Sequence, residues 1–434
     1  MAEVRKFDVL ILGAGPAGLS AAICLADSGF NIALIDKAEF PKNKTCGDGL
    51  TLDVINQLHL ISPELGEAFM NFPLKFPVYE TRIFSPDFRN ISIPSVSKGQ
   101  GKPMFICRRV DFDYFLFQYV KHFENIRIFQ NTKAVDVVKN KGSICVHADD
   151  CCFEGKILIC ADGATSISSA FQDLKRRKKE QFTLGLRAYY KGISPLNEFN
   201  PIEIYFIKDI LPGYLWIFPL GNGFANVGMG VSVSDLKKYH GSIKEKFEEL
   251  IKREPLKKRF EHAVNVEPVK GHVLPMSGKK KSISGKRYLM AGDAAGLVDP
   301  FSGEGVGNAI RSGRVAAAHI KNCFCKNDFS AEFNKAYDKE IYKRVGNEFF
   351  TGRVLLRLCK SYGFINFFIW AICKNEKQTD SFHRALKKYS IHKKSKMFLL
   401  LLRITYILTI QNIITSMVRT IKHHGEENTN IKDY

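Results

Sequence analysis

The sequence predicts an α/β protein that begins with a Rossmann-like parallel sheet. The first observation is the order strand, glycine turn, helix: the apolar run Val9–Leu12 leads into "GAGPAG" at 13–18 and then into an Ala/Leu-rich stretch ending near Gly29. The second is the apolar segment "NIALID", which ends in Asp36, 18 residues after the last glycine of the turn. With 434 residues, the chain is long enough for two substructures around one core or for a two-domain enzyme with an appendage.

Each glycine of this turn has its own steric task. Gly13 permits the tight turn, Gly15 omits the side chain that would block a pyrophosphate, and Gly18 lets the helix approach its strand closely. Backbone N–H groups at the start of the helix then face the phosphates. The Asp36 carboxylate is placed to accept both hydroxyls of an adenosine ribose. The segment predicts a dinucleotide site, and by itself it leaves open whether the ligand is NAD or FAD.

Charge and cysteine content narrow the class of protein. Sixty-four Lys and Arg against 44 Asp and Glu give a net charge of +20, with the excess in short runs at 175–179, 257–259, 279–281 and 392–396. Such a surface favours anionic partners. Eleven cysteines without paired CxxC spacing argue against a disulfide framework and a metal site, and favour a reducing compartment. The apolar start has no small-residue cleavage site, so we interpret it as folded structure and expect a cytoplasmic protein.

A second motif decides between the two dinucleotides. The segment "GKRYLMAGDAAGLVDPFSGEGVGNAIRSG" at 285–313 has a predicted strand at Tyr288–Ala291, then Gly292-Asp293, a loop and a helix from about Gly305. It resembles the second FAD-binding motif of the flavoprotein fold shared by aromatic hydroxylases, halogenases and geranylgeranyl reductases. The resemblance implies FAD, with Asp293 at the ribityl chain and residues 303–308 facing the isoalloxazine. A helix amino terminus there would stabilise the negative charge of reduced flavin.

Two shorter segments resemble the same fold. "RRVDFDYFL" at 108–116 resembles its Arg-x-x-Phe-Asp helix, which places Arg109 at the cofactor, and "ILICADGATS" at 157–166 resembles its strand followed by Asp-Gly. The four motifs occur in the order of the family and cover about residues 5–320. Together they imply that the cofactor is held by Gly13, Gly15, Ala17, Gly18, Asp36, Lys37, Cys46, Gly47, Arg109, Asp162, Gly163, Gly292, Asp293, Pro300, Gly303, Gly305, Val306, Gly307 and Asn308.

Three features indicate the branch of the family. Aromatic hydroxylases often continue "GDAA" with His, where this chain has Gly296, and halogenases need a Lys shortly after the first helix that we do not align with this chain. Geranylgeranyl reductases carry a Cys-Gly-x-Gly loop and a strand with the pattern Tyr-x-Trp-x-Phe-Pro, and this chain has "CGDGL" at 46–50 and "PGYLWIFP" at 212–219. The resemblance therefore implies reduction of isoprenoid double bonds. The alternative is an FAD-dependent monooxygenase or halogenase of a lipophilic aromatic substrate, and a lipid carrier that keeps FAD as structure is a third.

Three aromatic residues form the predicted substrate site. A spacing of two places Tyr214, Trp216 and Phe218 on one face of a strand, an apolar wall suited to a long hydrocarbon. The resemblance assigns this wall to the isoprenoid, and the competing interpretation is a core-facing strand.

The loop at 46–50 supplies the two candidate catalytic residues. Cys46 is expected beside flavin and substrate by resemblance, with a buried packing cysteine as the competing interpretation. Asp48 is a candidate proton source, although a turn residue in "GDG" fits its position as well.

The same resemblance implies the domain organisation. We expect a Rossmann-like FAD-binding domain of the aromatic-hydroxylase or glutathione-reductase type, discontinuous over 1–75, 104–175 and 284–325. It is interleaved with an antiparallel-sheet substrate domain at 76–103 and 176–283, and followed by a helical region at 326–422 and a disordered tail at 423–434.

The carboxy-terminal third is basic and apolar. The segment 397–418 is long enough to span a bilayer but contains Arg403, Gln411 and Asn412, so we interpret it as a monotopic helix or as a helix covering the substrate tunnel. We expect peripheral contact with the inner face of an anionic membrane and no nucleic-acid partner. Only one dinucleotide fingerprint is present, so we expect the reductant, either NAD(P)H or ferredoxin, to bind only transiently.

Overall fold

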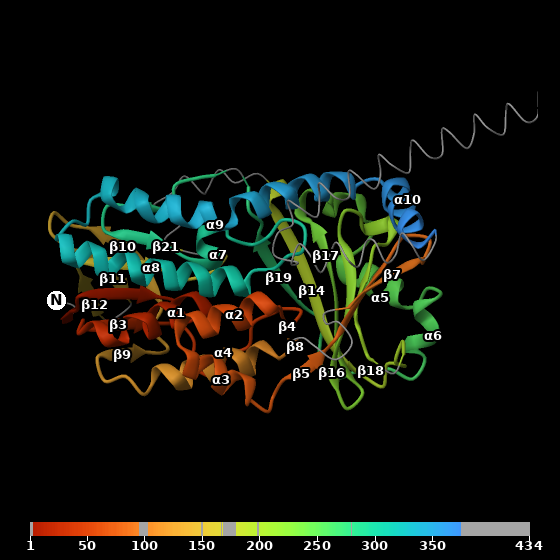
Figure 1. The fold of residues 1–434 in the computed structure, drawn as a ribbon, viewed down its shortest axis with the longest axis horizontal. Helices are drawn as coiled ribbons and strands as arrows, with labels where there is room; N and C mark the ends of the chain where they lie inside the picture. Colours follow the sequence, from red (N-terminus) through yellow and green to blue (C-terminus); the bar gives the residue numbers. More distant parts are fainter. Residues whose placement is uncertain are drawn as a thin grey trace, which may run out of the picture.

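The computed structural model describes residues 3–94, 103–148, 151–165, 167, 179–197, 199–278 and 280–374. It consists of two sheet-based halves placed side by side, with a long helix running along both (Figure 1). The predicted helical segment 397–418 and the tail at 423–434 lie outside the described residues.

A six-stranded sheet of order β20-β21-β13-β2-β3-β9 forms the centre of the first half. All neighbours are parallel except the β20/β21 pair. Its strands are β2 Val9–Leu12, β3 Ile32–Ile35, β9 Ile126–Phe129, β13 Ile157–Cys160, β20 Ser284–Gly285 and β21 Tyr288–Met290. The first two and β13 are buried at every position, as parallel strands covered on both faces must be. The predicted Rossmann-like sheet is confirmed.

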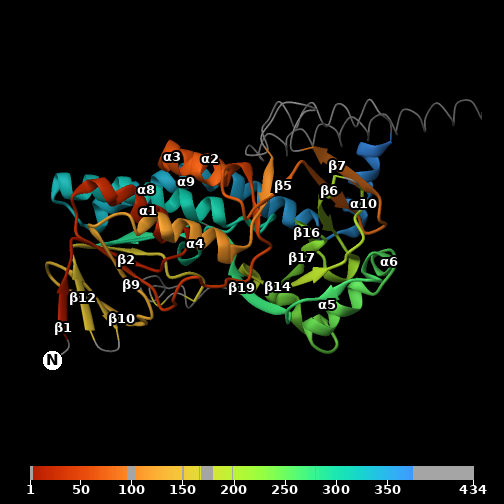
Figure 2. The ribbon, with the colours of Figure 1, turned by 90° about the horizontal axis from the view of Figure 1, so that it is seen from below.

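Helices and a second small sheet cover the two faces of this parallel sheet (Figure 2). The helices are α1 Pro16–Leu25, α2 Leu52–Ile61, α3 Pro63–Met70, α4 Arg109–Val120, α7 Gly292–Ala295 and α8 Val306–Lys326. The small sheet is β1 Glu3–Lys6, β12 Cys151–Gly155, β11 Ile144–Ala148 and β10 Ala134–Lys139. A Cβ on Gly313 would lie 2.1 Å from the Ala17 carbonyl oxygen, so glycine is required where α8 crosses α1.

The second half is an eight-stranded sheet of order β18-β14-β17-β16-β15-β6-β7, with β19 also paired to β14. Its pairs are antiparallel except β15/β6. Its strands are β6 Glu80–Phe84, β7 Asn90–Pro94, β14 Phe182–Lys191, β15 Ile202–Tyr205, β16 Tyr214–Gly221, β17 Phe224–Ser232, β18 Val264–Asn265 and β19 Lys270–Pro275. Helices α5 Ile243–Ile251 and α6 Leu256–Phe260 pack on it. The predicted interleaving of an antiparallel sheet with the Rossmann-like half is confirmed, while the domain boundaries remain a prediction.

Two further elements connect the halves. The short strands β4 Gly49–Leu50, β8 Met104–Ile106 and β5 Phe76–Val78 form a three-stranded sheet between them. Helix α9 Ala331–Leu358 runs from the first half to the second and is followed by α10 Tyr362–Cys373 (Figure 1). Among the described residues, no single helix has the length and hydropathy of a membrane span, and α9 with α10 reach that criterion only as a pair bent by 107°.

Candidate functional site

The first glycine turn has the local geometry that its sequence requires. Gly13 adopts φ +99°, and a Cβ there would lie 2.3 Å from the Ala161 carbonyl oxygen. A Cβ on Gly18 would lie 1.9 Å from the Gly13 carbonyl oxygen. By contrast, a Cβ on Gly15 would meet no atom within 4 Å. The first and third glycines are therefore needed by the fold itself, whereas the second leaves open space at the start of α1.

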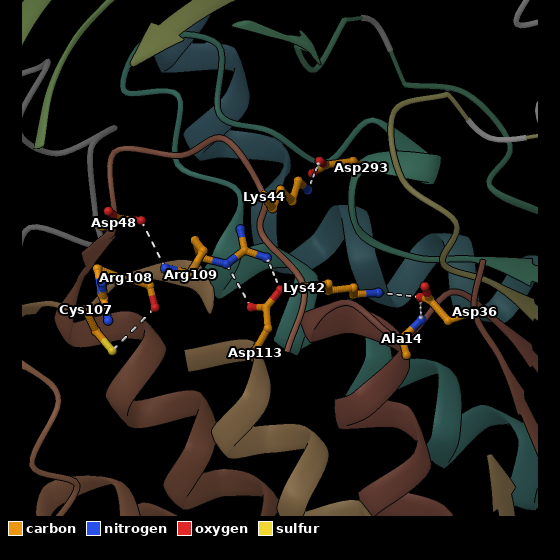
Figure 3. A network of polar contacts seen from close by, with 10 residues as sticks. All are labelled: Ala14, Asp36, Lys42, Lys44, Asp48, Cys107, Arg108, Arg109, Asp113 and Asp293. Atoms are coloured by element: carbon orange, nitrogen blue, oxygen red, sulfur yellow. Dashed lines mark hydrogen bonds and ion pairs between the residues drawn. The ribbon is translucent and has the colours of Figure 1, made fainter. Parts of the chain in front are cut away.

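Asp36 lies directly after β3 and is buried. Its carboxylate accepts hydrogen bonds from the backbone N–H groups of Ala14, at 2.6 Å, and Ala38, at 2.9 Å. It also pairs with Lys42, a residue that no sequence motif marks (Figure 3). Burial lowers the pKa of this ammonium, although Asp36 opposes the shift. The acid thus ties the glycine turn to the strand end, while the neighbouring Lys37 is exposed.

The second motif begins with an ion pair. Asp293, in α7, accepts a hydrogen bond from Lys44 at 2.8 Å (Figure 3). Burial alone would raise the pKa of this carboxyl, but Lys44 and Arg109 hold it below its ordinary value. Gly292 adopts φ +60°, and a Cβ there would press on the Cβ atoms of Ala17 and Ala309. Asp293 is therefore ionised, and the neighbouring Gly292 lies where α1 and α8 meet.

Arg109 opens helix α4 and is almost completely buried. Its guanidinium makes two hydrogen bonds to Asp113, of 2.8 and 2.7 Å (Figure 3). Burial would lower the pKa of Arg109, but Asp113 and then Cys46 raise it. The structure thus brings the predicted arginine and the predicted cysteine into the wall of one cavity.

Asp48 is the centre of a buried network. The side chain is fully buried, and the backbone adopts φ +66°, a left-handed conformation that Asp tolerates better than most residues. Its carboxylate accepts hydrogen bonds from the Arg109 backbone N–H at 3.1 Å, the Tyr189 hydroxyl at 2.6 Å and the Asn226 amide at 2.7 Å. Burial raises its pKa, and the hydrogen bonds from Tyr189 and Asn226 oppose the shift.

Asn226 extends this network to the aromatic strand. Its amide also donates to the Cys46 carbonyl oxygen at 2.8 Å, and its oxygen accepts from the Trp216 indole N–H at 2.9 Å. Neither Tyr189 nor Asn226 was predicted from the sequence, because they lie on strands β14 and β17 with no motif to mark them.

The aromatic residues of β16 form a continuous row. The ring centroids of Tyr214 and Trp216, and of Trp216 and Phe218, are both 6.1 Å apart. The Tyr214 hydroxyl donates to the Ser302 carbonyl oxygen at 2.6 Å. A Cβ on Gly47 would lie 3.0 Å from the Phe218 ring, so the CGDGL loop packs directly on the row.

A cavity of about 630 Å³ joins these parts. Predicted site residues in its wall are Cys46, Gly47, Arg109, Tyr214, Trp216, Phe218, Asp293, Pro300, Gly303, Gly305 and Val306. The other predicted residues lie outside its wall: Gly13, Gly15, Ala17, Gly18, Asp36, Lys37, Asp48, Asp162, Gly163, Gly292, Gly307 and Asn308. A volume of this size is typical of a cofactor or small-ligand site.

Several features of the site fit a bound FAD. Besides the open space at Gly15, a Cβ on Gly163, which adopts φ +82°, would also meet nothing within 4 Å, while Asp162 accepts the Ile167 backbone N–H at 2.9 Å. In the cavity wall, His272 Nε2 is buried and has no hydrogen-bond partner among the described residues. Buried polar atoms are normally paired, so an orphan of this kind points to a ligand. Burial, and then Lys44, lower the pKa of His272, which leaves its imidazole neutral near pH 7.

Comparison with known proteins gives two family matches within the chain. Residues 185–273 match the geranylgeranyl reductase catalytic domain, and residues 7–189 match the pyridine nucleotide-disulphide oxidoreductase family. Digeranylgeranylglycerophospholipid reductase 1 of Methanosphaera stadtmanae is 30% identical over 347 residues, covering 77% of this chain and 80% of that protein. The menaquinone reductase of Mycolicibacterium smegmatis is 29% identical over 321 residues, covering 72% of this chain and 76% of that protein.

Solved structures show the same fold. A geranylgeranyl bacteriochlorophyll reductase-like protein of Thermoplasma acidophilum superposes with a TM-score of 0.75 at 23% identity, covering 92% of this chain and 99% of that one. A halogenase in complex with phloroglucinol and FAD superposes with a TM-score of 0.69 at 18% identity, covering 91% of this chain and 86% of that one.

Proposed function

This chain belongs to the geranylgeranyl reductase family of FAD-dependent oxidoreductases, and we propose that it reduces carbon–carbon double bonds in the geranylgeranyl-type chain of an isoprenoid lipid. One observation carries the proposal: the aromatic row Tyr214, Trp216 and Phe218 lines the same cavity as Cys46 and Asp293. An apolar chain lying on that row would meet the residues assigned to the cofactor. The halogenase likeness is below 25% identity and supports the fold alone.

We propose that the two glycine-rich segments hold FAD. The open space at Gly15 would admit the pyrophosphate at the start of α1, and Asp36 would accept the ribose hydroxyls. Asp293, with Lys44 beside it, would hold the ribityl chain, and the start of α8 at Gly305 would face the isoalloxazine. His272 Nε2 has hydrogen-bonding capacity left for the same ligand.

Saturating an isolated alkene needs a hydride on one carbon and a proton on the other. Reduced FAD supplies the hydride when it is bound. The aromatic row holds the hydrocarbon and excludes water, which strengthens the electrostatic interactions of any nearby acid. Cys46 is our candidate for a catalytic residue because it lies in the cavity wall, next to the buried Arg109 guanidinium. The Asp48 side chain, which belongs to the same loop but lies outside the cavity wall, helps to hold Cys46 in place through Asn226.

The electron donor and the place of action complete the proposal. We infer that NAD(P)H or ferredoxin reduces the flavin during a transient visit, because the chain has a single dinucleotide fingerprint. We further infer peripheral contact with an anionic membrane, since a geranylgeranyl lipid is almost insoluble in water and the chain carries a net charge of +20.

The test is direct reduction of a lipid by the FAD-loaded protein. Purified protein is reduced with dithionite and mixed in detergent with a digeranylgeranyl glycerophospholipid. The masses of the lipid products are then measured by mass spectrometry. We expect masses that increase in steps of two hydrogens. Oxygen consumption coupled to a product heavier by one oxygen would instead identify a monooxygenase and overturn the proposal.

A further inference from the structure

One part of the cavity wall is not apolar. Arg353, Arg357 and Lys360 all line the cavity, and all three come from α9 or the residues just after it. Arg353 and Arg357, four residues apart, share one face of the helix, and Lys360 follows two residues after its end. Because α9 runs from one half of the molecule to the other (Figure 1), it carries these cations to the same cavity as the aromatic row.

These three cations have no carboxylate partner in the part of the chain that the structure describes. Among the residues that the structure describes, none of them forms an ion pair, and Arg353 donates only to the Gly278 carbonyl oxygen, at 2.8 Å. Burial, together with the adjacent Arg357, lowers the pKa of Arg353. The acids in the cavity wall are engaged elsewhere: Asp235 pairs with Lys238 at 2.6 Å, Asp293 pairs with Lys44 at 2.8 Å, and Glu304 accepts a hydrogen bond from Thr51 at 2.7 Å. Within the described residues, the three side chains therefore bring positive charge without an ion-pair partner to the cavity wall.

The cations lie at a defined end of the aromatic row. A Cβ on Gly352 would lie 3.0 Å from Pro300 Cγ, so α9 packs against the loop that Tyr214 also contacts through Ser302. Tyr214, Phe301 and Cys359 belong to one apolar cluster. At the other end of the row, Phe218 packs with Met104 and Ile202 in a separate apolar cluster.

The wall thus changes from cationic near Tyr214 to an apolar cluster near Phe218. This matches the shape of an amphiphile with one anionic end and one hydrocarbon end, and arginine is well suited to phosphate oxygens.

We propose that Arg353, Arg357 and Lys360 form a binding site for the phosphate or diphosphate head of the lipid substrate. The proposal rests on the proposed function and adds the direction of the substrate: the head lies at α9 and the hydrocarbon runs along the row toward Phe218. The site would therefore select phosphorylated isoprenoids over the free alcohol, and it would set which end of the chain stays outermost.

The test compares two substrates that share a hydrocarbon chain. Geranylgeranyl diphosphate and geranylgeraniol are reduced in detergent by the full-length, FAD-loaded protein. In the double variant Arg357→Gln/Lys360→Gln we expect the KM for the diphosphate to rise at least about tenfold, as for one lost charge-assisted hydrogen bond. The kcat/KM for the alcohol should stay within about twofold. The matched control is Lys257→Gln/Lys258→Gln, which removes two exposed charges outside the cavity wall and should change neither value.

Two further measurements distinguish binding of the substrate's own phosphate from binding of membrane phospholipids. Inorganic diphosphate should bind the parent protein by calorimetry, and the Arg357/Lys360 variant should bind it at least about tenfold more weakly. Vesicles of phosphatidylglycerol should bind the variant and the control equally. An unchanged KM for the diphosphate, or equal KM increases for both substrates, would overturn the proposal. So would a loss of vesicle binding without a KM effect, because the cations would then face a membrane.

Failure of the proposed function has a different signature. In that case the parent protein reduces neither substrate, while the calorimetric arm with inorganic diphosphate still decides whether the cations bind phosphate.

Discussion

Replacement of Asp48 by asparagine tests whether this residue is a proton source or a structural centre. The carboxylate is fully buried, receives three hydrogen bonds and is absent from the cavity wall. Asparagine keeps the size and tolerates the left-handed backbone at φ +66°. It removes the charge and replaces one acceptor oxygen with a donor nitrogen.

The expected loss follows from the three donors. Whichever way the introduced side-chain amide turns, its nitrogen faces either the Arg109 N–H or the pair formed by Tyr189 and Asn226. At least one hydrogen bond to a charged acceptor is lost, which costs roughly 1.5–3 kcal/mol of unfolding free energy. We therefore expect the variant to be destabilised by about that amount, since removing a buried charge offsets the weakening of the remaining bonds.

The assay has two readouts. Urea unfolding of the FAD-loaded protein gives the change in stability, and alkene reduction per bound FAD gives the change in chemistry. The structural interpretation predicts reduced stability with turnover per FAD within about threefold of the parent. A general acid typically contributes about 10²–10⁴ in rate. A variant of unchanged stability whose turnover falls by about that factor would refute our interpretation and make Asp48 the proton source.

A matched control removes one hydrogen bond to Asp48 while it keeps the carboxylate charge. Tyr189→Phe removes one donor to Asp48 and nothing from the cavity wall, so it should cost roughly 1.5–3 kcal/mol of stability. The double variant should lose less stability than the sum of the two single losses, because both changes weaken or remove the hydrogen bond between Tyr189 and residue 48. Full additivity would mean that the two groups do not interact.

Four further predictions concern separate residues. Asp36→Ala should weaken FAD binding, measured by calorimetry, by about 1.5–3 kcal/mol, and unchanged affinity would show that its carboxylate serves only the glycine turn. Cys46→Ala should keep FAD bound but change the rate or extent of alkene reduction, whereas an identical product pattern by mass spectrometry would make it a packing residue. Trp216→Ala should lose roughly 3–5 kcal/mol of buried contact and impair turnover of long prenyl chains in detergent; turnover equal to that of the parent would contradict the substrate wall. For His272 the folded-state pKa lies below the ordinary value of about 6.5, so the unfolded state binds more protons and stability falls as pH drops below that value. Between pH 7 and 5, the unfolding temperature of His272→Gln should fall less steeply with pH than that of the parent protein. Equal slopes would exclude a contribution of His272 to the pH dependence of stability.

The parts of this protein that the sequence alone predicts are those whose geometry is local. Gly13 is required by its positive φ, and Gly18 by its close contact with the Gly13 carbonyl oxygen, so their spacing alone indicates the structure. The same holds for the row on β16, because alternate residues of any strand share a face. Cys46, Arg109 and Asp293 were found through motifs shared with a family, and the cavity does bring them together.

The residues that support those motifs become visible only in the folded molecule. Asp48 receives its hydrogen bonds from Tyr189 and Asn226, which are 141 and 178 residues away, and Lys44 pairs with Asp293 across 249 residues. The periodicity of a strand predicts which of its residues share a face, but it does not predict which residue of another strand they contact. Contacts at such sequence separations depend on how the two sheets pack. The cations of α9 illustrate the same limit: in the sequence they are ordinary basic residues beyond the last motif, and only the packing of α9 against the loop at Pro300 places them in the cavity wall.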